Sequence, residues 1–404
     1  MRGFFIIFCC VCINLVQAQN ITLSGRVVDK TSQEPLAFAS IGIKGKSLGV
    51  ISNLQGEFDF YIPNEFRNEI LVISMLGYKS YEAPIWSITG SPSVNIEMER
   101  STTYLQELIV QDSLKGGDIL RIALSRADDN LPQKPFLMDG FYRDIKRVGG
   151  TYISLMEAAV QIYDEDSKEP RNKHKLKERV KLVEMRQSLG YESKFTTFFD
   201  QDNLLEDLLL NNNIRYRQIE AREELFEVMN REKDSYYNGH EIFVIAYTGE
   251  YTFRIFIDKE DYAIIRFEYK SSNESKEVVG KRKELEGRFA GTDKVVEFKR
   301  YEGKMYISFM KMTTAIDWYD LRTDELKFKT ELFQQLLINK IDTSPVGRIG
   351  ATESMKRYGL QFQNFNYNKA FWDSYNVIKR TPLDSQIIAD LEKAGPLEKQ
   401  FEEN

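Results

Sequence analysis

Cysteine and histidine are scarce in this chain of 404 residues, which contains three cysteines and two histidines. All three cysteines lie within the first twelve residues, so a chain without that segment could form no disulfide and carry out no thiol chemistry. His174 and His240 lie far apart, and neither has the neighbouring ligands of a zinc enzyme. We therefore expect no catalytic zinc, no other metal site and no cofactor.

Excess positive charge and long apolar runs are also lacking. The chain has 55 lysines and arginines against 61 aspartates and glutamates, and its formal net charge is −6. A mildly acidic chain does not bind nucleic acid through bulk charge, so no nucleic-acid partner is expected. Beyond the N-terminal segment, no stretch approaches the roughly eighteen apolar residues of a membrane span, which excludes a transmembrane helix.

The motifs of common enzyme classes are missing as well. There is no G-x-S-x-G elbow, no P-loop and no G-x-G-x-x-G fingerprint. Glu157 and Glu268 lie on predicted strands, where a carboxylate pair of the glycosidase type is conceivable. Acids on a strand are usually solvated, so we expect no catalytic residue and a protein that is not an enzyme. A hydrolase with an unrecognised acidic pair is kept as an alternative.

Residues 1–18 have the pattern of a signal peptide. Met1-Arg2 gives a positive start, Phe4–Val16 is almost wholly apolar, and Val16-Gln17-Ala18 offers compact residues to a signal peptidase. None of the cysteines follows the small residue that a lipoprotein signal requires. We expect cleavage after Ala18, which leaves 404 − 18 = 386 residues, exported to the periplasm or outer membrane without a lipid anchor.

Residues 20–99 are predicted to form a seven-stranded β-sandwich. In Phe58–Ile62 the apolar residues alternate with polar ones, as in a strand with one buried face. Turn-forming Pro, Gly and Asn separate such runs. The predicted strands are Ile21–Asp29, Ala37–Ile43, Gly49–Ser52, Glu57–Ile62, Ile70–Met75, Lys79–Pro84 and Ser93–Met98. Seven short strands in a stretch of this length are typical of a sandwich.

Four motifs in this stretch resemble the carboxypeptidase-regulatory-like (transthyretin-like) domain. They are Gly25-Arg-Val-Val-Asp29, Glu34-Pro-Leu-Ala-Phe-Ala-Ser-Ile41, Gly49-Val-Ile-Ser-Asn-Leu-Gln-Gly56-Glu-Phe58 and Leu71-Val-Ile-Ser-Met-Leu-Gly77-Tyr78. The resemblance implies an accessory module without catalytic residues. The family favours Thr and Asp where this chain has Ser52, Asn53 and Gln55, which argues against a calcium site. We expect Gly77 to lie in a turn that needs a positive φ.

Residues 100–113 are predicted to be a linker or one more strand. They resemble the segment that follows this module in TonB-dependent outer-membrane receptors, where it leads into a plug and a barrel. Only 404 − 113 = 291 residues follow here. That number is too small for such a plug with its barrel of about 22 strands.

Residues 114–404 are predicted to form a larger α+β domain built on a curved antiparallel sheet. Its first elements are a helix over Ile119–Ala127 with Ser113 as a possible N-cap and a hairpin of Phe136–Lys146 and Thr151–Tyr163. A charged stretch, Asp164–Glu184, is then expected to be a solvated loop and edge. Seven strands are predicted after it: Glu241–Tyr247, Thr252–Asp258, Ala263–Tyr269, Lys283–Phe289, Lys294–Tyr301, Lys304–Ile316 and Leu326–Ile338. Long strands with little helix between them indicate one apolar face that other elements must cover.

Two helices and an aromatic run complete the expected elements. Leu204–Leu209 is a short amphipathic helix, predicted to pack on one face of the sheet. Asp200 and Asp202 before it fit N-capping better than a calcium loop. A C-terminal helix is expected to begin at Thr381-Pro382 and to stop at Gly395-Pro396. The aromatic residues between them are expected to be core or a latch: Phe362, Phe365, Tyr367, Phe371, Trp372 and Tyr375.

Two further resemblances concern the large region. The segments Tyr237–Val244, Phe253–Asp258 and Ala263–Glu268 are similar to the lipoprotein-carrier fold, in which a curved sheet wraps helices and holds acyl chains. The whole chain also resembles a group of exported proteins of Gram-negative bacteria. The likeness rests on the regulatory-like module and on the motifs Phe141-Tyr142-Arg143, Glu157-Ala158 and Phe371-Trp372-x-x-Tyr375-Asn376. That group implies no biochemical activity.

The leading functional hypothesis is a non-enzymatic exported binding or envelope-assembly protein. The sandwich would be a docking module and the large sheet a binding surface, with an envelope or outer-membrane protein, a lipid or a glycan as partner. The alternative is a carrier of a lipid or other apolar ligand inside the curved sheet. Helices that cover the apolar face fully would favour the docking role, and incomplete cover would leave a ligand site.

Overall fold

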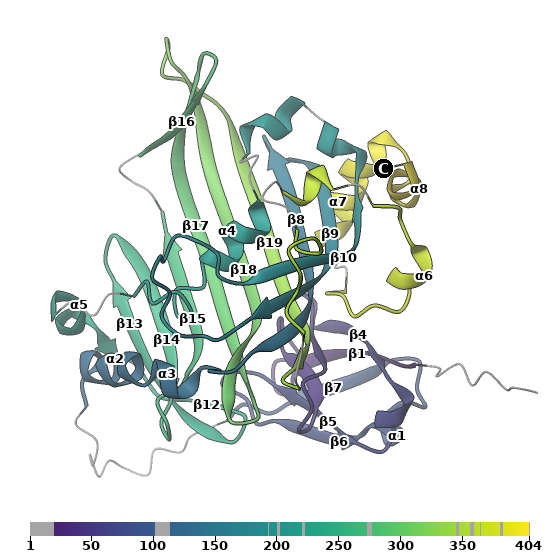
Figure 1. Ribbon diagram of the computed structural model, residues 1–404, viewed down its shortest axis with the longest axis vertical. Helices are drawn as coiled ribbons and strands as arrows, with labels where there is room; N and C mark the ends of the chain where they lie inside the picture. Colours follow the sequence, from purple (N-terminus) through teal and green to yellow (C-terminus); the bar gives the residue numbers. More distant parts are fainter. Residues whose placement is uncertain are drawn as a thin grey trace, which may run out of the picture.

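The computed structural model describes residues 20–101, 114–192, 194–199, 203–219, 223–272, 277–344, 347–355, 359–363, 365–379 and 383–403. The fold is mainly β, with a small N-terminal sandwich beside a large antiparallel sheet (Figure 1). The predicted fold class is therefore confirmed. The predicted signal peptide and residues 102–113 of the predicted linker lie outside the described residues.

The sandwich has seven strands in two sheets, one in the order β4-β1-β7 and the other in the order β3-β2-β5-β6. The strands are β1 (Ile21–Asp29), β2 (Ser40–Ile43), β3 (Gly49–Ile51), β4 (Glu57–Ile62), β5 (Ile70–Ser74), β6 (Tyr81–Pro84) and β7 (Val94–Met98), with a short helix α1 (Ile85–Ile88) before β7. The predicted alternation in β4 is confirmed, because Phe58, Phe60 and Ile62 are all buried. β1 pairs with β4 in antiparallel and with β7 in parallel orientation.

A buried carboxylate closes the sandwich where β1 ends. Asp29 Oδ1 accepts the backbone N–H groups of Thr31 and Ser32, at 2.8 and 2.9 Å. Its Oδ2 accepts the Tyr78 hydroxyl at 2.8 Å and Arg100 Nε at 2.6 Å. These hydrogen bonds hold the pKa of the Asp29 carboxyl far below its ordinary value. The N–H of Ser32 has the largest effect, and Arg100 and Tyr78 have smaller ones. One ionised group thus joins β1 to the turn before β6 and to the chain that leaves the sandwich.

Twelve strands of the described chain form the large sheet. Its order is β10-β9-β8-β19-β18-β17-β15-β14-β13-β11, with β12 paired to β13 and β16 paired to β17. The strands are β8 (Phe136–Val148), β9 (Thr151–Asp164), β10 (Arg179–Gln187), β11 (Asn230–Arg231), β12 (Ser235–Tyr237), β13 (His240–Thr248), β14 (Tyr251–Asp258), β15 (Ile264–Ser271), β16 (Val278–Arg282), β17 (Leu285–Tyr301), β18 (Lys304–Asp320) and β19 (Leu326–Asp342). The predicted hairpin of β8 and β9 is confirmed.

Each face of this sheet carries its own apolar row. On one face the directly paired residues are Ile245, Ile255, Phe267, Val296, Met310, Leu336, Tyr142, Ala158 and Met185. All of them belong to one buried cluster. The neighbouring residues Phe309, Leu337, Phe141 and Ala159 point to the opposite face and belong to another cluster. Because successive side chains of a strand point to opposite sides, both faces of this sheet require cover.

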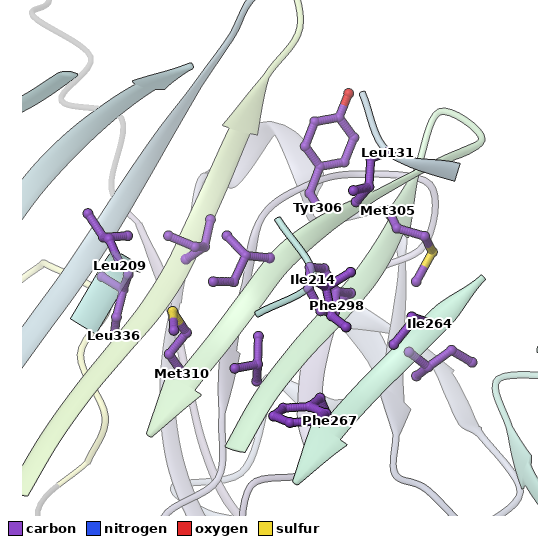
Figure 2. Close-up of a cluster of buried hydrophobic side chains, with 14 of the residues drawn as sticks. Leu131, Leu209, Ile214, Ile264, Phe267, Phe298, Met305, Tyr306, Met310 and Leu336 are labelled. Atoms are coloured by element: carbon purple, nitrogen blue, oxygen red, sulfur yellow. The ribbon is translucent and has the colours of Figure 1, made fainter. Parts of the chain in front are cut away.

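Short helices and the loops between them cover the first face, called here the helix face. They are α2 (Gly116–Ser125), α3 (Ala127–Asn130), α4 (Leu204–Leu210) and α5 (Glu223–Val228). Figure 2 shows Leu209 and Ile214, from α4 and the loop after it, packed over Phe267, Met310 and Leu336 of the sheet. The predicted packing of the Leu204–Leu209 helix is confirmed.

The predicted helix caps need correction or stay untested. The α4 helix is capped by Asn203, whose side chain accepts the N–H of Glu206, while Asp200 and Asp202 lie outside the described residues. The α2 helix begins at Gly116, before the predicted apolar stripe, and Lys115 occupies the N-cap without a side-chain hydrogen bond. The predicted cap Ser113 also lies outside the described residues.

The sandwich and the C-terminal segment cover the opposite face, called here the sandwich face. Ile51 of β3 shares a buried cluster with Phe309 and Leu337 of the sheet and with Trp372 of α6 (Lys369–Trp372). The sandwich is also joined to the C-terminal segment through Asn376. The amide of Asn376 accepts the N–H of Tyr61 at 2.8 Å and donates to its C=O at 3.1 Å. The expectation that the aromatic run acts as core or latch is confirmed for Trp372.

The C-terminal end differs from the prediction in two ways. The α7 helix (Leu383–Leu391) ends before Gly395, and a 3₁₀ turn, Glu392–Ala394, fills the interval. A further helix, α8 (Leu397–Glu403), follows Pro396 and was not predicted. Proline suits the start of a helix as well as its end, because it lacks the N–H that the first turn leaves unpaired. The predicted starting residues Thr381 and Pro382 lie outside the described residues.

Two predictions for the middle of the chain were wrong. The separate strands Lys283–Phe289 and Lys294–Tyr301 are one strand, β17, because a β-bulge at Gly291 (φ +153°) lets the pairing with β18 continue. The charged stretch Asp164–Glu184 contains the expected edge strand, since β10 begins at Arg179 and ends the sheet, but the stretch is not wholly solvated. Asp164 is buried and receives a hydrogen bond from Arg215 Nε at 2.9 Å, so an arginine outside the stretch neutralises it.

Among the helices that the structure describes, none is long and apolar enough to cross a membrane.

We predict that Gly77→Val destabilises the protein by about 1–3 kcal/mol, because a branched residue is strained at positive φ. Gly77 has φ +84°, and the nearest atom to an added Cβ is Ser235 Oγ at 3.9 Å, so the cost comes from the backbone rather than from a clash. Urea unfolding of the full chain measures the change. Gly90→Val is the control, because Gly90 has open space around it and no positive φ. Equal losses in the two variants would contradict the prediction.

Candidate ligand-binding cavity

The structure does not bring the candidate acidic pair together. Glu157 lies on β9 and Glu268 on β15, and β8, β19, β18 and β17 run between these two strands. Five strand spacings of about 4.8 Å separate them by roughly 24 Å. Glycosidase carboxylates lie about 5–10 Å apart, so these two residues cannot form such a pair.

Glu157 is instead the centre of a buried ionic cluster on the sandwich face. Its carboxylate accepts Arg143 Nε at 2.7 Å and Arg186 Nε at 2.6 Å, and it is completely buried. The Arg186 guanidinium lies 4.3 Å from the ring centroid of Trp372, and Arg143 donates to the C=O of Ile378. The cluster therefore holds the C-terminal segment against the sheet, which is a structural role.

The two histidines have different surroundings. His174 lies exposed in a loop, where its backbone N–H is bonded to Asn172 Oδ1. His240 Nδ1 lies 2.9 Å from Asp258 and 3.4 Å from Glu260. Among the described residues, these three form the only group of three potential metal ligands. Arg300 contacts the same Asp258 carboxylate at 3.2 Å. A guanidinium at that carboxylate already balances its charge, so the arrangement is an ion pair at a strand end.

The helix face of the sheet is not completely covered. A cavity of about 600 Å³ lies between the segment that contains α5 and strands β13, β14 and β15. It is lined by Asn213, Gln218, Ile219, Glu224, Leu225, Val228, Tyr247, Tyr251, Phe253, Phe267 and Tyr269. Its volume lies within the range of about 300–1,000 Å³ that small-molecule sites occupy. Eight of these eleven side chains are apolar or aromatic.

An aromatic layer on the sheet forms the floor of the cavity. Phe253 is the direct cross-strand partner of both Tyr247 and Tyr269. The three side chains therefore point to the same face of the sheet. The ring centroid of Tyr251 lies 5.0 Å from that of Tyr247 and 5.5 Å from that of Tyr269. Phe267 lies in the next row, 6.2 Å from Phe253. Rings at these separations form a continuous apolar surface.

The α5 helix supplies the opposite wall and explains why the cover is incomplete. It has only six residues, so it presents little more than one turn to the sheet. Phe226 is buried in the core, and the partly exposed Arg121 guanidinium lies 4.4 Å from its ring centroid. Leu225 and Val228 line the cavity, and Val228 is 45% exposed. A helix this short buries Phe226 and leaves Leu225 and Val228 at the mouth of the cavity.

A buried lysine lies at one edge of the aromatic floor. Lys294 of β17 is the direct cross-strand partner of Tyr269, so its side chain lies on the helix face. Its Nζ is bonded to Asn211 Oδ1 at 3.1 Å and to Asn213 Oδ1 at 2.5 Å. The same nitrogen lies 5.8 Å from the ring centroid of Phe267 and 5.6 Å from that of Tyr269. Burial lowers the pKa of the Lys294 ammonium to about 8.

A second cavity, of about 420 Å³, separates part of the sandwich from the sheet. It is lined by charged groups that already have partners. Lys44 is paired with Glu82, Arg300 with Asp258, and Lys299 Nζ donates to the C=O of Ser47 at 2.6 Å. This cavity lies at a joint between the two parts of the molecule and is more polar than the aromatic one.

The sequence did not single out any of the residues that line the aromatic cavity as a site. A usable signal was present, because Tyr247, Tyr251 and Phe253 have the same parity along a hairpin and must share one face. The lining residues of α5 and the loop before it carried no such signal. The contact of these residues with the aromatic floor depends on how the helices pack on the sheet.

Comparison with known families identifies the N-terminal part. Residues 23–110 match the model of the CarboxypepD_reg-like domain. The chain therefore carries a carboxypeptidase-regulatory-like domain. Its strands β1–β7 are those of the sandwich, and the predicted resemblance is confirmed.

One curated relative and two solved structures are similar to parts of the chain. The TonB-dependent receptor SusC of Bacteroides thetaiotaomicron is 31% identical over 93 residues, which are 23% of this chain and 8% of the receptor. A LolA superfamily protein from Nitrosomonas europaea is 14% identical and covers 56% of this chain and 94% of its own, with a TM-score of 0.19. The Pseudomonas aeruginosa MucA/MucB complex is 10% identical over 56% of this chain and 98% of the other, with a TM-score of 0.17.

The extent of these matches limits what they say about the whole protein. The chain spans less than a tenth of the length of the SusC receptor, and the match is confined to 93 residues. Likenesses at TM-scores near 0.2 say nothing about what this chain binds.

We predict that Glu157→Gln destabilises the full chain by about 3–5 kcal/mol, because it leaves the buried guanidinium of Arg143 and the largely buried one of Arg186 without their counter-charge. Guanidinium chloride unfolding measures the loss. Glu268→Gln is the matched control, since Glu268 is a partly exposed strand acid that is paired with Arg266 at 2.7 Å. It should cost less than about 1 kcal/mol. A neutral Glu157→Gln variant would show that the cluster does not hold the C-terminal segment in place.

Proposed function

We propose that the protein is a non-enzymatic binding protein of the bacterial envelope, which takes an apolar chain into the aromatic cavity on the helix face. The observation that carries this proposal is the incomplete cover of that face. Five aromatic residues of three adjacent strands line a space of about 600 Å³, and three of them, Tyr247, Tyr251 and Tyr269, are only partly buried. Apolar surface left open in this way is costly in water, so a ligand that fills it gains the free energy of burial.

The chemistry of the wall supports an acyl or similarly elongated apolar group. The sheet contributes rings, and α5 contributes the branched side chains of Leu225 and Val228. The polar lining groups, Asn213, Gln218 and Glu224, come from the loop and helix that lie over the floor. A site that is apolar on one side and polar on the other suits an amphipathic ligand.

The envelope location is supported by the N-terminal domain. The matched portion of SusC belongs to a protein named as a TonB-dependent receptor, and the first eighteen residues of this chain have the pattern of a signal peptide. We infer that the protein acts on the periplasmic side of the outer membrane. N-terminal sequencing of the protein recovered from that compartment should begin at or near Gln19.

A docking role for the sandwich is the second candidate. One side of the sandwich is already used within the molecule, because Ile51 and the backbone of Tyr61 contact the sheet and the C-terminal segment. The exposed Trp86 on α1 lies elsewhere on the sandwich and is 59% exposed, which favours a protein contact there. Recovery of the ligand-free protein with a bound envelope protein would favour docking over ligand carriage.

We predict that N-phenyl-1-naphthylamine, a neutral probe that fluoresces in apolar sites, binds the full chain and is displaced by dodecanol. Val228→Asn should weaken probe binding by about three- to tenfold, because it replaces an apolar contact at the cavity mouth with an amide. The two residues have similar helix propensities, so α5 should be kept. A fluorescence titration with each variant measures the effect.

Val279→Asn is the matched control for this prediction. Val279 is 48% exposed, close to the 45% of Val228, but it lies on β16, which takes no part in the cavity. It should bind the probe as the unchanged chain does. Absence of probe binding by the unchanged chain, or equal weakening in both variants, would contradict the proposed function.

A further inference from the structure

The ammonium group of Lys294 is buried without an ionic partner. The residue is 6% exposed, and no carboxylate oxygen lies within 4 Å of its Nζ in the described part of the chain. In the row of directly paired residues that runs from Lys294 through Met312 and Gln334, the buried carboxylate is Asp144 of β8. Three strand spacings place it about 14 Å away. A buried charge that only neutral groups contact is unusual, because burial removes hydration that neutral dipoles replace incompletely.

The two amides that contact this lysine are held with their oxygen atoms toward it. Asn211 donates its Nδ2 to the C=O of Asp207 at 2.9 Å, so its Oδ1 is left to face the ammonium. Asn213 donates its Nδ2 to Gln218 Oε1 at 2.9 Å, and Gln218 in turn donates to the C=O of Leu210 at 3.1 Å. This chain of hydrogen bonds fixes the amide orientation and keeps the lysine in place. It therefore preserves a positive charge in an apolar layer.

The same lysine lies directly behind the lining of the cavity rather than in the lining itself. Its partners Asn213, Phe267 and Tyr269 all line the cavity, and Tyr269 is its direct cross-strand neighbour. An ammonium has three donor hydrogens, and the two asparagine oxygens take two of them. The third has no acceptor among the described residues. A positive charge with a remaining donor thus lies one side chain behind the wall of an apolar cavity.

We propose that the ligand of the cavity is an anionic amphiphile, whose apolar chain lies on the aromatic floor and whose acidic head group pairs with Lys294. This inference rests on the proposed function and adds the charge of the ligand to it. A carboxylate or phosphate at the edge of the floor would supply the counter-charge that the fold itself does not provide. The apolar chain would then extend over Tyr251 and Phe253 toward Val228.

One acid also lines the cavity, and its position is compatible with this orientation. Glu224 is exposed at the beginning of α5, where water and salt screen its charge. Lys294 is buried and is bonded to Asn211 and Asn213, so its charge is screened less than that of Glu224. An anionic head group is therefore drawn to the lysine side of the cavity and repelled weakly from the mouth.

Isothermal titration calorimetry with three ligands of equal chain length tests the inference on the full protein. The ligands are dodecanoate, dodecanol and dodecyltrimethylammonium, studied below their micelle concentrations at pH 7. The unchanged chain should bind dodecanoate about tenfold more tightly than dodecanol, the factor expected for one charge-assisted hydrogen bond. It should bind the cationic ligand most weakly. Lys294→Met should abolish the preference for dodecanoate while dodecanol binding is retained.

Lys299→Met is the control variant. Lys299 lies on the same strand, and burial also lowers its pKa to about 8, but its side chain lies in the polar cavity beside the sandwich. The control should keep the preference for dodecanoate. A Lys294→Met variant that also keeps it would overturn the inference, because the lysine would then only hold the loop on the sheet.

The outcomes separate this inference from the function on which it rests. Dodecanol binding without any preference for dodecanoate by the unchanged chain would overturn the anionic ligand and leave the apolar site standing. No binding of any of the three ligands would overturn both. If Lys294→Met does not fold, the order of the three ligands on the unchanged chain still decides, since a preference for the cation or for neither charge contradicts the proposal.

Discussion

The structure depends on one constraint, which is that a twelve-stranded sheet with two apolar faces must be covered on both. Leu336 and Leu337 are neighbours on β19, yet one packs under helices and the other beneath the C-terminal segment and the sandwich. Neither layer alone would keep the sheet out of water. The N-terminal domain is thus a structural part of the large one, joined through Ile51 and Tyr61, as well as a recognisable module.

The two faces use buried charge in different ways. On the sandwich face, Glu157 neutralises two arginines and one of them stacks on Trp372, so the charges assemble the molecule. On the helix face, Lys294 is held by amides alone beside an aromatic hollow. A complete ion pair stabilises a fold, whereas an incomplete one next to a cavity offers an interaction to a ligand.

Much of the fold was predictable because strand periodicity is a local property. The alternation of Phe58, Phe60 and Ile62 predicts a strand wherever that segment lies, and β4 matches the prediction. The continuity of β17 was not predictable, because the bulge at Gly291 is tolerated only where β18 pairs on both sides of it. The α8 helix was missed for a related reason: Leu397 and Phe401 are stabilised by burial beside Ile145 and Leu155 of the hairpin.

The sequence by itself determined the β character of the chain, its regulatory-like domain and the absence of the familiar enzyme motifs. These features depend only on motifs and on period-two alternation, both of which involve a few neighbouring residues. The tertiary structure alone decided the site. Val228, Phe253 and Lys294 meet because a six-residue helix lies over three antiparallel strands, and their contact depends on the order of those strands. The tertiary structure likewise separates Glu157 from Glu268. The order of the strands in a sheet follows from long-range packing, which no local sequence pattern predicts.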